Sequence, residues 1–303
     1  MNTIKTSQRN TIGLVLGSGS ARGWAHIGVI HELTAIGIRP DIVCGTSIGA
    51  LVGAAYATGK LESLESWVLG ITGRNLVQYL DVRLVVGGGF VEGKRLMSFF
   101  KRRFGDVLIE QLPVRFGSVA TDLITGQELW LTAGPLWDAV RASIAFPGIV
   151  TPANLNGQWL VDGGLVNPIP VSLCRALGAE TVIAVNLNGD IVGKHFVERK
   201  KPGSEHVGSS TEAKFLERLT IRLRRKMNAA TPGLFDVLAG SINIMQDRIT
   251  QSGLVGASPD VIIAPKLAHI GLMELDRARE AIGEGRACVR SMIPSLKQAL
   301  HLP

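Results

Sequence analysis

Residues 42 to 57 constrain the fold of this chain more than any other segment. The apolar run Ile42-Val43-Cys44 predicts a buried strand, and the small residues from Ala50 to Ala57 predict a helix. Only Gly45-Thr46-Ser47-Ile48-Gly49 stands between them, so the chain must turn sharply from strand to helix. Glycines two positions before and two positions after the serine let this turn pass close to neighbouring backbone.

The same five residues match the pattern G-x-S-x-G, in which a serine stands on a strained strand-to-helix turn. The hydroxyl group would lie above the first turn of the helix, where backbone N–H groups and the helix dipole favour developing negative charge. The pattern therefore predicts a nucleophile at Ser47. An ordinary tight turn between a strand and a helix is the alternative, since glycine and serine are common residues.

A second glycine-rich turn comes earlier in the chain. Ile12 to Leu16 predicts a first buried strand, and Gly17-Ser18-Gly19-Ser20-Ala21-Arg22-Gly23 leads from it into a helix from about residue 24 to 36. The loop could suggest a dinucleotide site, as in a nucleotide-dependent oxidoreductase, but two features speak against it: Gly23 comes one place late, and Asp41 begins the second strand instead of ending it. Its backbone N–H groups suit an oxyanion better, since that use requires residues without bulky side chains.

A third turn carries an acidic residue. Asn156-Gly157 is a strong two-residue hairpin signal, and the strand from 158 to 161 after it delivers Asp162 onto Gly163-Gly164. An acid at the end of a strand, followed by two glycines, is well placed for a functional site. In isolation, Asp-Gly-Gly is more often a simple turn than part of a functional site.

Composition limits the class of protein. The chain has 303 residues, of which 46% are apolar and 19% charged, enough for one large α/β domain or two modest ones. Residues 1 to 10 lack the apolar core of a signal peptide, and no run approaches the roughly 18 apolar residues of a membrane span. Cys44, Cys174 and Cys288 fit reduced thiols better than a disulfide frame or a zinc site. We therefore expect a cytoplasmic protein.

The net charge of +7 raises the question of an anionic partner. Much of the positive excess lies in the amphipathic segment 213–227, whose arginines face away from an apolar stripe. This segment could make peripheral contact with an anionic membrane, or it could be a helix packed on the domain with a solvated basic face. Nucleic-acid binding is not expected, because no known motif accompanies the charge.

The remaining pattern gives the domain organisation. We expect a catalytic core over 12–187, a polar linker or insertion over 188–211, and a helical C-terminal part with one strand, packed on the core, over 212–303. Gly87 to Gly89 could hinge a lid or form a surface loop. Further expected helices cover residues 61–72, 94–104, 135–144, 171–177, 234–250 and 274–300, the last with a break near Pro294, and further strands cover 115–121, 128–132, 181–187 and 260–265.

Taken in order, the three turns resemble the motifs of the patatin-like phospholipase family, and most closely its bacterial branch related to neuropathy target esterase. Residues 142–148 (Ala-Ser-Ile-Ala-Phe-Pro-Gly) and 166–170 (Val-Asn-Pro-Ile-Pro) add to the match, which covers about residues 12–187. The resemblance implies a three-layer α/β/α fold with a mostly parallel central sheet. It also implies a dyad in which Ser47 is the nucleophile and Asp162 the general base.

The resemblance further implies an oxyanion hole and a set of motif glycines. The hole would be formed by Gly17, Ser18, Gly19 and Ser20, with Arg22 and Gly23 nearby, and the motif glycines are Gly45, Gly49, Gly163 and Gly164. The family often has glycine where this chain has Ser18 and Ser20, but a serine still offers its backbone N–H. None of the six histidines stands in a recognisable triad context, so a two-residue dyad is expected.

The implied function is that of a serine acyl hydrolase for carboxylic esters of lipids, of phospholipase, lysophospholipase or esterase type. It would work through an acyl-enzyme and would need no metal ion or other cofactor. The alternative is a regulatory or interaction protein that retains the fold with little turnover. The sequence is compatible with an oligomer.

Overall fold

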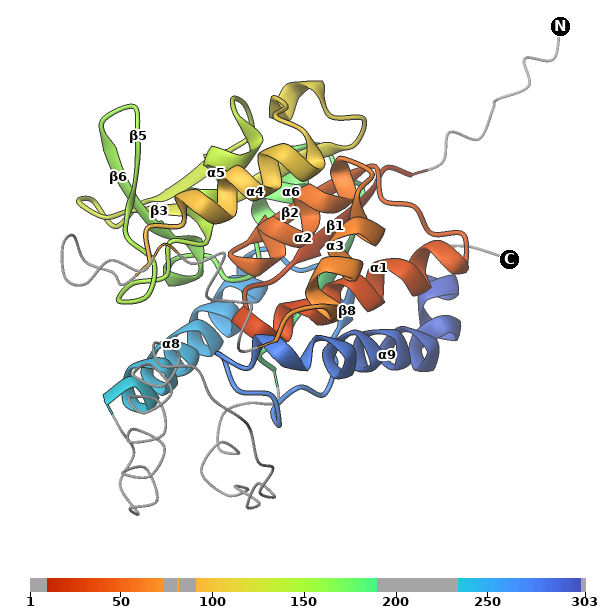
Figure 1. The fold of residues 1–303 in the computed structure, drawn as a ribbon. Coiled ribbons are helices and arrows are strands. Elements are labelled where there is room, and N and C mark those ends of the chain that lie inside the picture. Colours follow the sequence, from red (N-terminus) through yellow and green to blue (C-terminus); the bar gives the residue numbers. More distant parts are fainter. Residues whose placement is uncertain (1–9, 73–80, 82–90, 190–233, 301–303) are drawn as a thin grey trace, which may run out of the picture.

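The computed structural model describes residues 10–72, 81, 91–189 and 234–300, which form an eight-stranded sheet between helices (Figure 1). Hydrogen-bonded pairing connects the strands along the path β5-β6-β3-β2-β1-β7-β8, and β4 also pairs with β3. Strands β3, β2, β1, β7 and β8 run parallel, whereas β4 and β6 are antiparallel to β3. The bounds are β1 Ile12–Leu16, β2 Ile42–Thr46, β3 Arg115–Asp122, β4 Glu128–Leu131, β5 Ala153–Leu155, β6 Gln158–Asp162, β7 Thr181–Val185 and β8 Val261–Ile263.

Helices cover both faces of the sheet, as the side chains of β1 illustrate. Successive side chains of a strand point to opposite faces, so Leu14 and Leu16 share one core with Ile183, while Val15 lies in the other. The first core includes residues of α1 (Ala25–Ala35), α2 (Ile48–Ala57), α3 (Leu61–Leu69), α4 (Lys94–Phe104), α5 (Leu136–Ser143) and α9 (Ala278–Ala299). The second includes residues of α6 (Val171–Ala176) and, at its margin, of α8 (Leu234–Gly256). The predicted three-layer fold with a mostly parallel sheet is confirmed.

The C-terminal part of the chain belongs to the same sheet. Strand β8 pairs with β7, and α9 packs along α1, as Figure 1 shows. Glycines allow the backbones of the two helices to come close. A Cβ on Gly28 would stand 2.0 Å from the carbonyl oxygen of Ile282, and a Cβ on Gly285 would stand 2.1 Å from that of Ala25.

The break expected near Pro294 is wrong, because α9 continues through this proline to Ala299. A proline inside a helix removes one backbone hydrogen bond, which normally favours an interruption. Pro294 is exposed, so water can reach the carbonyl group that loses its partner, while the opposite side of α9 stays packed on α1. The same predicted helix also begins later, since residues 275–277 form a 3-10 turn before α9.

Strands β2 and β6 share one edge of β3, and this arrangement creates the site. Strand β4 pairs with residues 118–121 of β3, so it occupies one edge there. Both β2, which ends with Thr46 opposite Val119, and β6, which ends with Asp162 opposite Ala120, must therefore use the other edge. The two strands enter that edge from opposite directions and meet end to end.

The predicted hairpin is present, with Asn156 at φ +52° and Gly157 at φ +86° between β5 and β6. The basic segment 213–227, the glycines at 87–89 and residues 190–211 of the expected linker fall outside the described residues. Within the described ranges, no helix combines the length and the apolar character needed to cross a membrane.

Candidate active site

Ser47 stands on a strained turn between β2 and α2. Its backbone angles are φ +58° and ψ −124°, which a residue with a side chain adopts only when its surroundings force it. Close contacts require both glycines of the motif. A Cβ on Gly45 would lie 2.4 Å from the carbonyl carbon of Gly49, and a Cβ on Gly49 would lie 2.1 Å from the carbonyl oxygen of Leu16.

The structure brings Ser47 and Asp162 together. The hydroxyl group of Ser47 donates a hydrogen bond of 2.5 Å to Oδ2 of Asp162, and the N–H of Gly164 donates one of 2.7 Å to Oδ1. The carboxyl group is 1% exposed, and burial raises its pKa from about 3.8 to about 6, against the opposing effect of these two hydrogen bonds. Gly163 permits the turn, since a Cβ there would lie 2.2 Å from the carbonyl oxygen of Val119.

Two further side chains fix the turn that carries Ser47. The N–H of Ser47 donates to the hydroxyl group of Ser143 at 2.9 Å, and that hydroxyl group donates to the carbonyl oxygen of Val119 at 2.6 Å. Thr46 donates to the carbonyl oxygen of Asn167 at 2.9 Å. Because the N–H of Ser47 already has this acceptor, it is not available to bind an oxyanion. In the sequence, residues 142–148 contribute only to the resemblance to the family, and no local signal singles out Ser143.

The glycine-rich loop lies beside the dyad, with only part of its N–H groups available. The N–H of Gly17 donates to Val185 at 3.1 Å and that of Ser18 donates to Pro168 at 2.9 Å. In the part of the chain that the structure describes, the N–H groups of Gly19 and Ser20 have no acceptor. Of the four residues predicted to form the oxyanion hole, Gly19 and Ser20 are therefore the two whose backbone N–H groups are available to an oxyanion.

The other loop residues support the backbone. Ser20 has φ +52°, and its hydroxyl group donates to the carbonyl oxygen of Leu272 at 2.7 Å. Gly23 packs against α2, since a Cβ there would lie 2.1 Å from a methyl group of Ile48. The guanidinium group of Arg22 is fully buried and donates from Nε to the carbonyl oxygen of Gly19 at 3.3 Å.

The three histidines that the structure describes have structural partners. His26 contacts the carbonyl oxygen of Gly17 through Nε2 at 2.8 Å, and burial lowers its pKa to about 4, so the ring is neutral and donates this bond. His31 contacts Glu65 at 2.8 Å, and His269 contacts Glu280 at 2.9 Å. None of these three rings hydrogen-bonds to Ser47 or Asp162.

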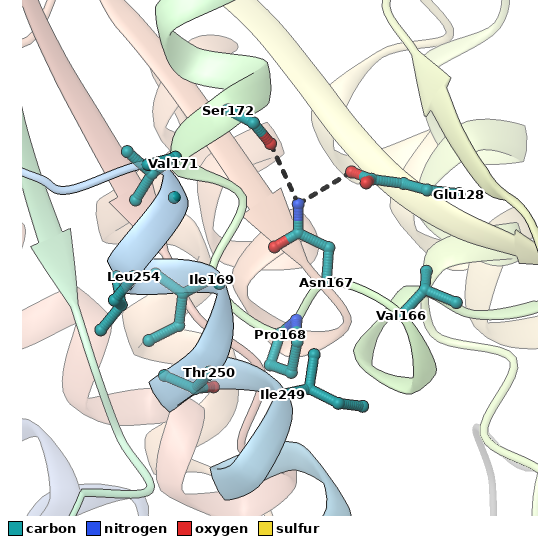
Figure 2. A pocket seen from close by; sticks show the side chains of 13 residues that line it. Glu128, Val166, Asn167, Pro168, Ile169, Val171, Ser172, Ile249, Thr250 and Leu254 are labelled. Atoms are coloured by element: carbon teal, nitrogen blue, oxygen red, sulfur yellow. Dashed lines mark hydrogen bonds between the residues drawn. The ribbon is translucent and has the colours of Figure 1, made fainter.

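A cavity of about 390 Å³ opens beside the chain that follows Asp162 (Figure 2). Val166 and Pro168 line it on one side, and Ile249, Thr250 and Leu254 of α8 line it on the other. Asn167 crosses one end and donates to Glu128 at 2.8 Å and to Ser172 at 3.2 Å. The lining includes neither Ser47 nor Asp162.

Comparisons with known proteins identify the family to which this chain belongs. Residues 14–175 match the family model described as patatin-like phospholipase, and the chain belongs to this family. Proteins of the family are typically serine hydrolases, and a patatin-like phospholipase domain implies a lipid acyl hydrolase. The family predicted from the three turns is confirmed.

Several relatives carry the name of the NTE family. An uncharacterized NTE family protein of Mycobacterium tuberculosis is 32% identical over 94% of this chain and 91% of its own length. The patatin-like phospholipase domain-containing protein 6 of Mus musculus is 37% identical over 59% of this chain and 14% of its own length. Among solved structures, VipD from Legionella pneumophila aligns with a TM-score of 0.47 and 11% identity, covering 97% of this chain and 72% of that chain.

Proposed function

We propose that this protein is a serine acyl hydrolase that cleaves carboxylic esters of lipids through an acyl-enzyme on Ser47. One observation carries the proposal: the hydroxyl group of Ser47, on a strained turn, donates a 2.5 Å hydrogen bond to a buried carboxylate. An isolated serine is a poor nucleophile and needs a base within hydrogen-bond reach. Asp162 meets this requirement without a histidine.

Burial makes Asp162 a better base than an ordinary aspartate. A carboxylate with the reference pKa of about 3.9 accepts a proton only weakly, whereas a pKa of about 6 leaves the group ionised at neutral pH and more basic. As Ser47 attacks the ester carbonyl, its proton passes to Oδ2 of Asp162. The carbonyl oxygen becomes negative, and the N–H groups of Gly19 and Ser20 stabilise it.

The intermediate collapses when the bond to the alcohol breaks. The leaving alcohol takes the proton from Asp162, and the acyl group remains on Ser47. A water molecule then attacks the acyl carbonyl and gives its proton to Asp162. Release of the fatty acid returns this proton to the oxygen of Ser47, so the enzyme ends the cycle unchanged.

A fluorophosphonate probe tests for the activated serine directly. Wild-type protein should be labelled, Ser47→Ala should not, and Asp162→Asn should react far more slowly. Ser66→Ala is the matched control, because Ser66 is exposed on α3 and donates only to the carbonyl oxygen of Glu62. Folded wild-type protein that resists the probe and hydrolyses no ester would overturn the proposal and favour a regulatory protein that retains the fold.

A further inference from the structure

Three successive carbonyl groups of the glycine-rich loop each accept a hydrogen bond from a buried side chain. Gly17 accepts from His26 at 2.8 Å, Ser18 accepts from Asn188 at 3.3 Å, and Gly19 accepts from Nε of Arg22 at 3.3 Å. The donors come from α1, from the segment that follows β7 and from the 3-10 turn Ser20–Trp24. Side chains therefore fix the carbonyl groups of this loop, in addition to the hydrogen bonds that the loop's own N–H groups donate.

These carbonyl bonds determine where the N–H groups of the loop point. In a trans peptide the C=O and the N–H lie in one plane and point in opposite directions, and the described chain has no cis peptide bond. Anchoring the carbonyl of Ser18 therefore orients the N–H of Gly19. Anchoring the carbonyl of Gly19 orients the N–H of Ser20 in the same way. These are the two N–H groups that lack an acceptor among the described residues.

Helix α8 holds both of the anchoring side chains. Oε1 of Gln246 accepts from Nδ2 of Asn188 at 3.4 Å, and Oδ1 of Asn243 accepts from the guanidinium group of Arg22 at 3.0 Å. Gln246 and Asn243 are three residues apart, share one face of the helix, and are 5% and 6% exposed. The amide of Asn243 therefore supports, through Arg22, the peptide group between Gly19 and Ser20. The amide of Gln246 supports, through Asn188, the peptide group between Ser18 and Gly19.

Gln246 also lies close to the turn that follows Asp162. Its Oε1 accepts a further hydrogen bond of 3.2 Å from the hydroxyl group of Ser18, so its Nε2 faces the turn after Asp162. The point where a Cβ on Gly164 would stand is 2.4 Å from this Nε2 and 3.0 Å from Oδ1 of Asp162. An amide donor beside a carboxylate is electrostatically favourable, which supports this orientation of the amide.

We propose that α8 positions the oxyanion hole: Asn243 and Gln246 hold Arg22 and Asn188, which in turn orient the N–H groups of Ser20 and Gly19. Helix α8 lies outside residues 14–175, which match the family model, so this role belongs to a part of the chain beyond that match. The inference rests on the proposed function. It makes Asn243 and Gln246 positioning residues, because they act through other side chains.

Full-length variants test this role by steady-state hydrolysis of a p-nitrophenyl ester. Asn243→Leu and Gln246→Leu should each lower kcat by about 10- to 100-fold while KM changes by less than about threefold, since donors are misaligned only where charge develops. Asn243→Asp should restore most of kcat, because its carboxylate still accepts from Arg22. Gln251→Leu is the matched control on α8, since Gln251 is exposed and bonds only to Asp247.

A second variant keeps the test decisive if a leucine variant fails to fold. Asn188→Ala removes the donor between Gln246 and the loop, so it should reproduce the loss of kcat. Combined with Gln246→Leu it should cost no more than either change alone, because both act on one peptide group. Additive losses, or variants that fold and keep kcat within about twofold of the wild type, would overturn the role of α8.

Hydrogen exchange separates this inference from the proposed function. Peptides that span residues 14–24 should exchange faster in Asn243→Leu and Gln246→Leu than in the wild type and in Gln251→Leu, whether or not the protein turns over an ester. Unchanged exchange would refute the positioning role. If exchange is faster in the two leucine variants but the wild-type protein hydrolyses no ester, the positioning role would stand and the proposed hydrolase would be refuted.

Discussion

Ser47 Oγ and Asp162 Oδ2 lie 2.5 Å apart because β2 and β6 meet end to end on the same edge of β3. Strand β2 ends with Thr46 opposite Val119, and β6 ends with Asp162 opposite Ala120, the next residue along β3. The dyad therefore depends on backbone register in the sheet. Neither side chain has to reach across a flexible loop.

Removal of the base should nearly abolish turnover. Asp162→Asn keeps the shape of the side chain but cannot take the proton of Ser47, and a positioned general base contributes about 10²- to 10⁴-fold. We expect kcat/KM for a p-nitrophenyl ester to fall by about that factor. An activity within tenfold of the wild type, in a folded variant, would mean that another group serves as the base.

The activity should depend on the ionisation of Asp162. Burial raises the pKa of this carboxyl group to about 6, and only the ionised form accepts a proton. The value of kcat/KM should therefore rise with pH, reach half its maximum near pH 6 and level off above about pH 7. Thermal unfolding at each pH controls for loss of structure. A profile that is flat from pH 5 to pH 8 would argue against Asp162 as the base.

The same pKa predicts a cost in stability. The pKa of Asp162 is higher in the folded protein than in the unfolded chain, so its contribution to the free energy of unfolding is present below about pH 4 and lost as the pH rises through about 6. A shift of about two pKa units corresponds to about 3 kcal/mol. Asp162→Asn should therefore raise the Tm at pH 8 more than at pH 4.5. An equal change of Tm at both values would contradict this origin.

Ser143 should be required for the geometry of the elbow. Ser143→Ala leaves both the N–H of Ser47 and the carbonyl oxygen of Val119 without a partner, in a fully buried place. Unsatisfied buried groups cost about 1–3 kcal/mol each, so the free energy of unfolding should fall measurably, and kcat should fall by more than tenfold. Chemical denaturation and ester hydrolysis measure the two effects. Ser66→Ala, which changes an exposed serine, should alter neither.

Two glycines on α9 offer a matched test of the packing between α1 and α9. A Cβ on Gly285 would stand 2.1 Å from the carbonyl oxygen of Ala25, whereas a Cβ on Gly283 meets nothing within 4 Å. Gly285→Ala should destabilise the protein, by about 1–3 kcal/mol as for overpacked cores. Gly283→Ala should stabilise it by up to about 1 kcal/mol, because alanine is the better helix former. Denaturant midpoints compare the two, and equal effects would contradict the close approach of the helices.

The parts of the site that depend on local backbone geometry could be predicted from the sequence. The sequence identifies the serine between Gly45 and Gly49 and the acid before Gly163. Close contacts exclude any other residue at these three glycines, so the motifs are visible in the sequence. The meeting of the two turns could not be derived from spacing. It depends on which edge of β3 receives β6, a pairing of segments far apart in the chain.

No signal in the sequence identifies the residues of α8 that hold the glycine-rich loop in place. Asn243 and Gln246 stand on a helix where amides three residues apart look like an ordinary solvated face. Only tertiary packing buries them against Arg22 and Asn188. Local propensity also misjudged Pro294, whose exposed position and packed neighbours let α9 continue.

Direct detection of the acyl-enzyme tests the central claim most sharply. Wild-type protein mixed with a p-nitrophenyl ester of a fatty acid and quenched in acid within milliseconds should carry the acyl group on the peptide that contains Ser47, identified by mass spectrometry. Ser47→Ala should release no p-nitrophenol above background and should carry no acyl group. A burst of product without acylation of Ser47, or hydrolysis that persists in Ser47→Ala, would contradict the mechanism.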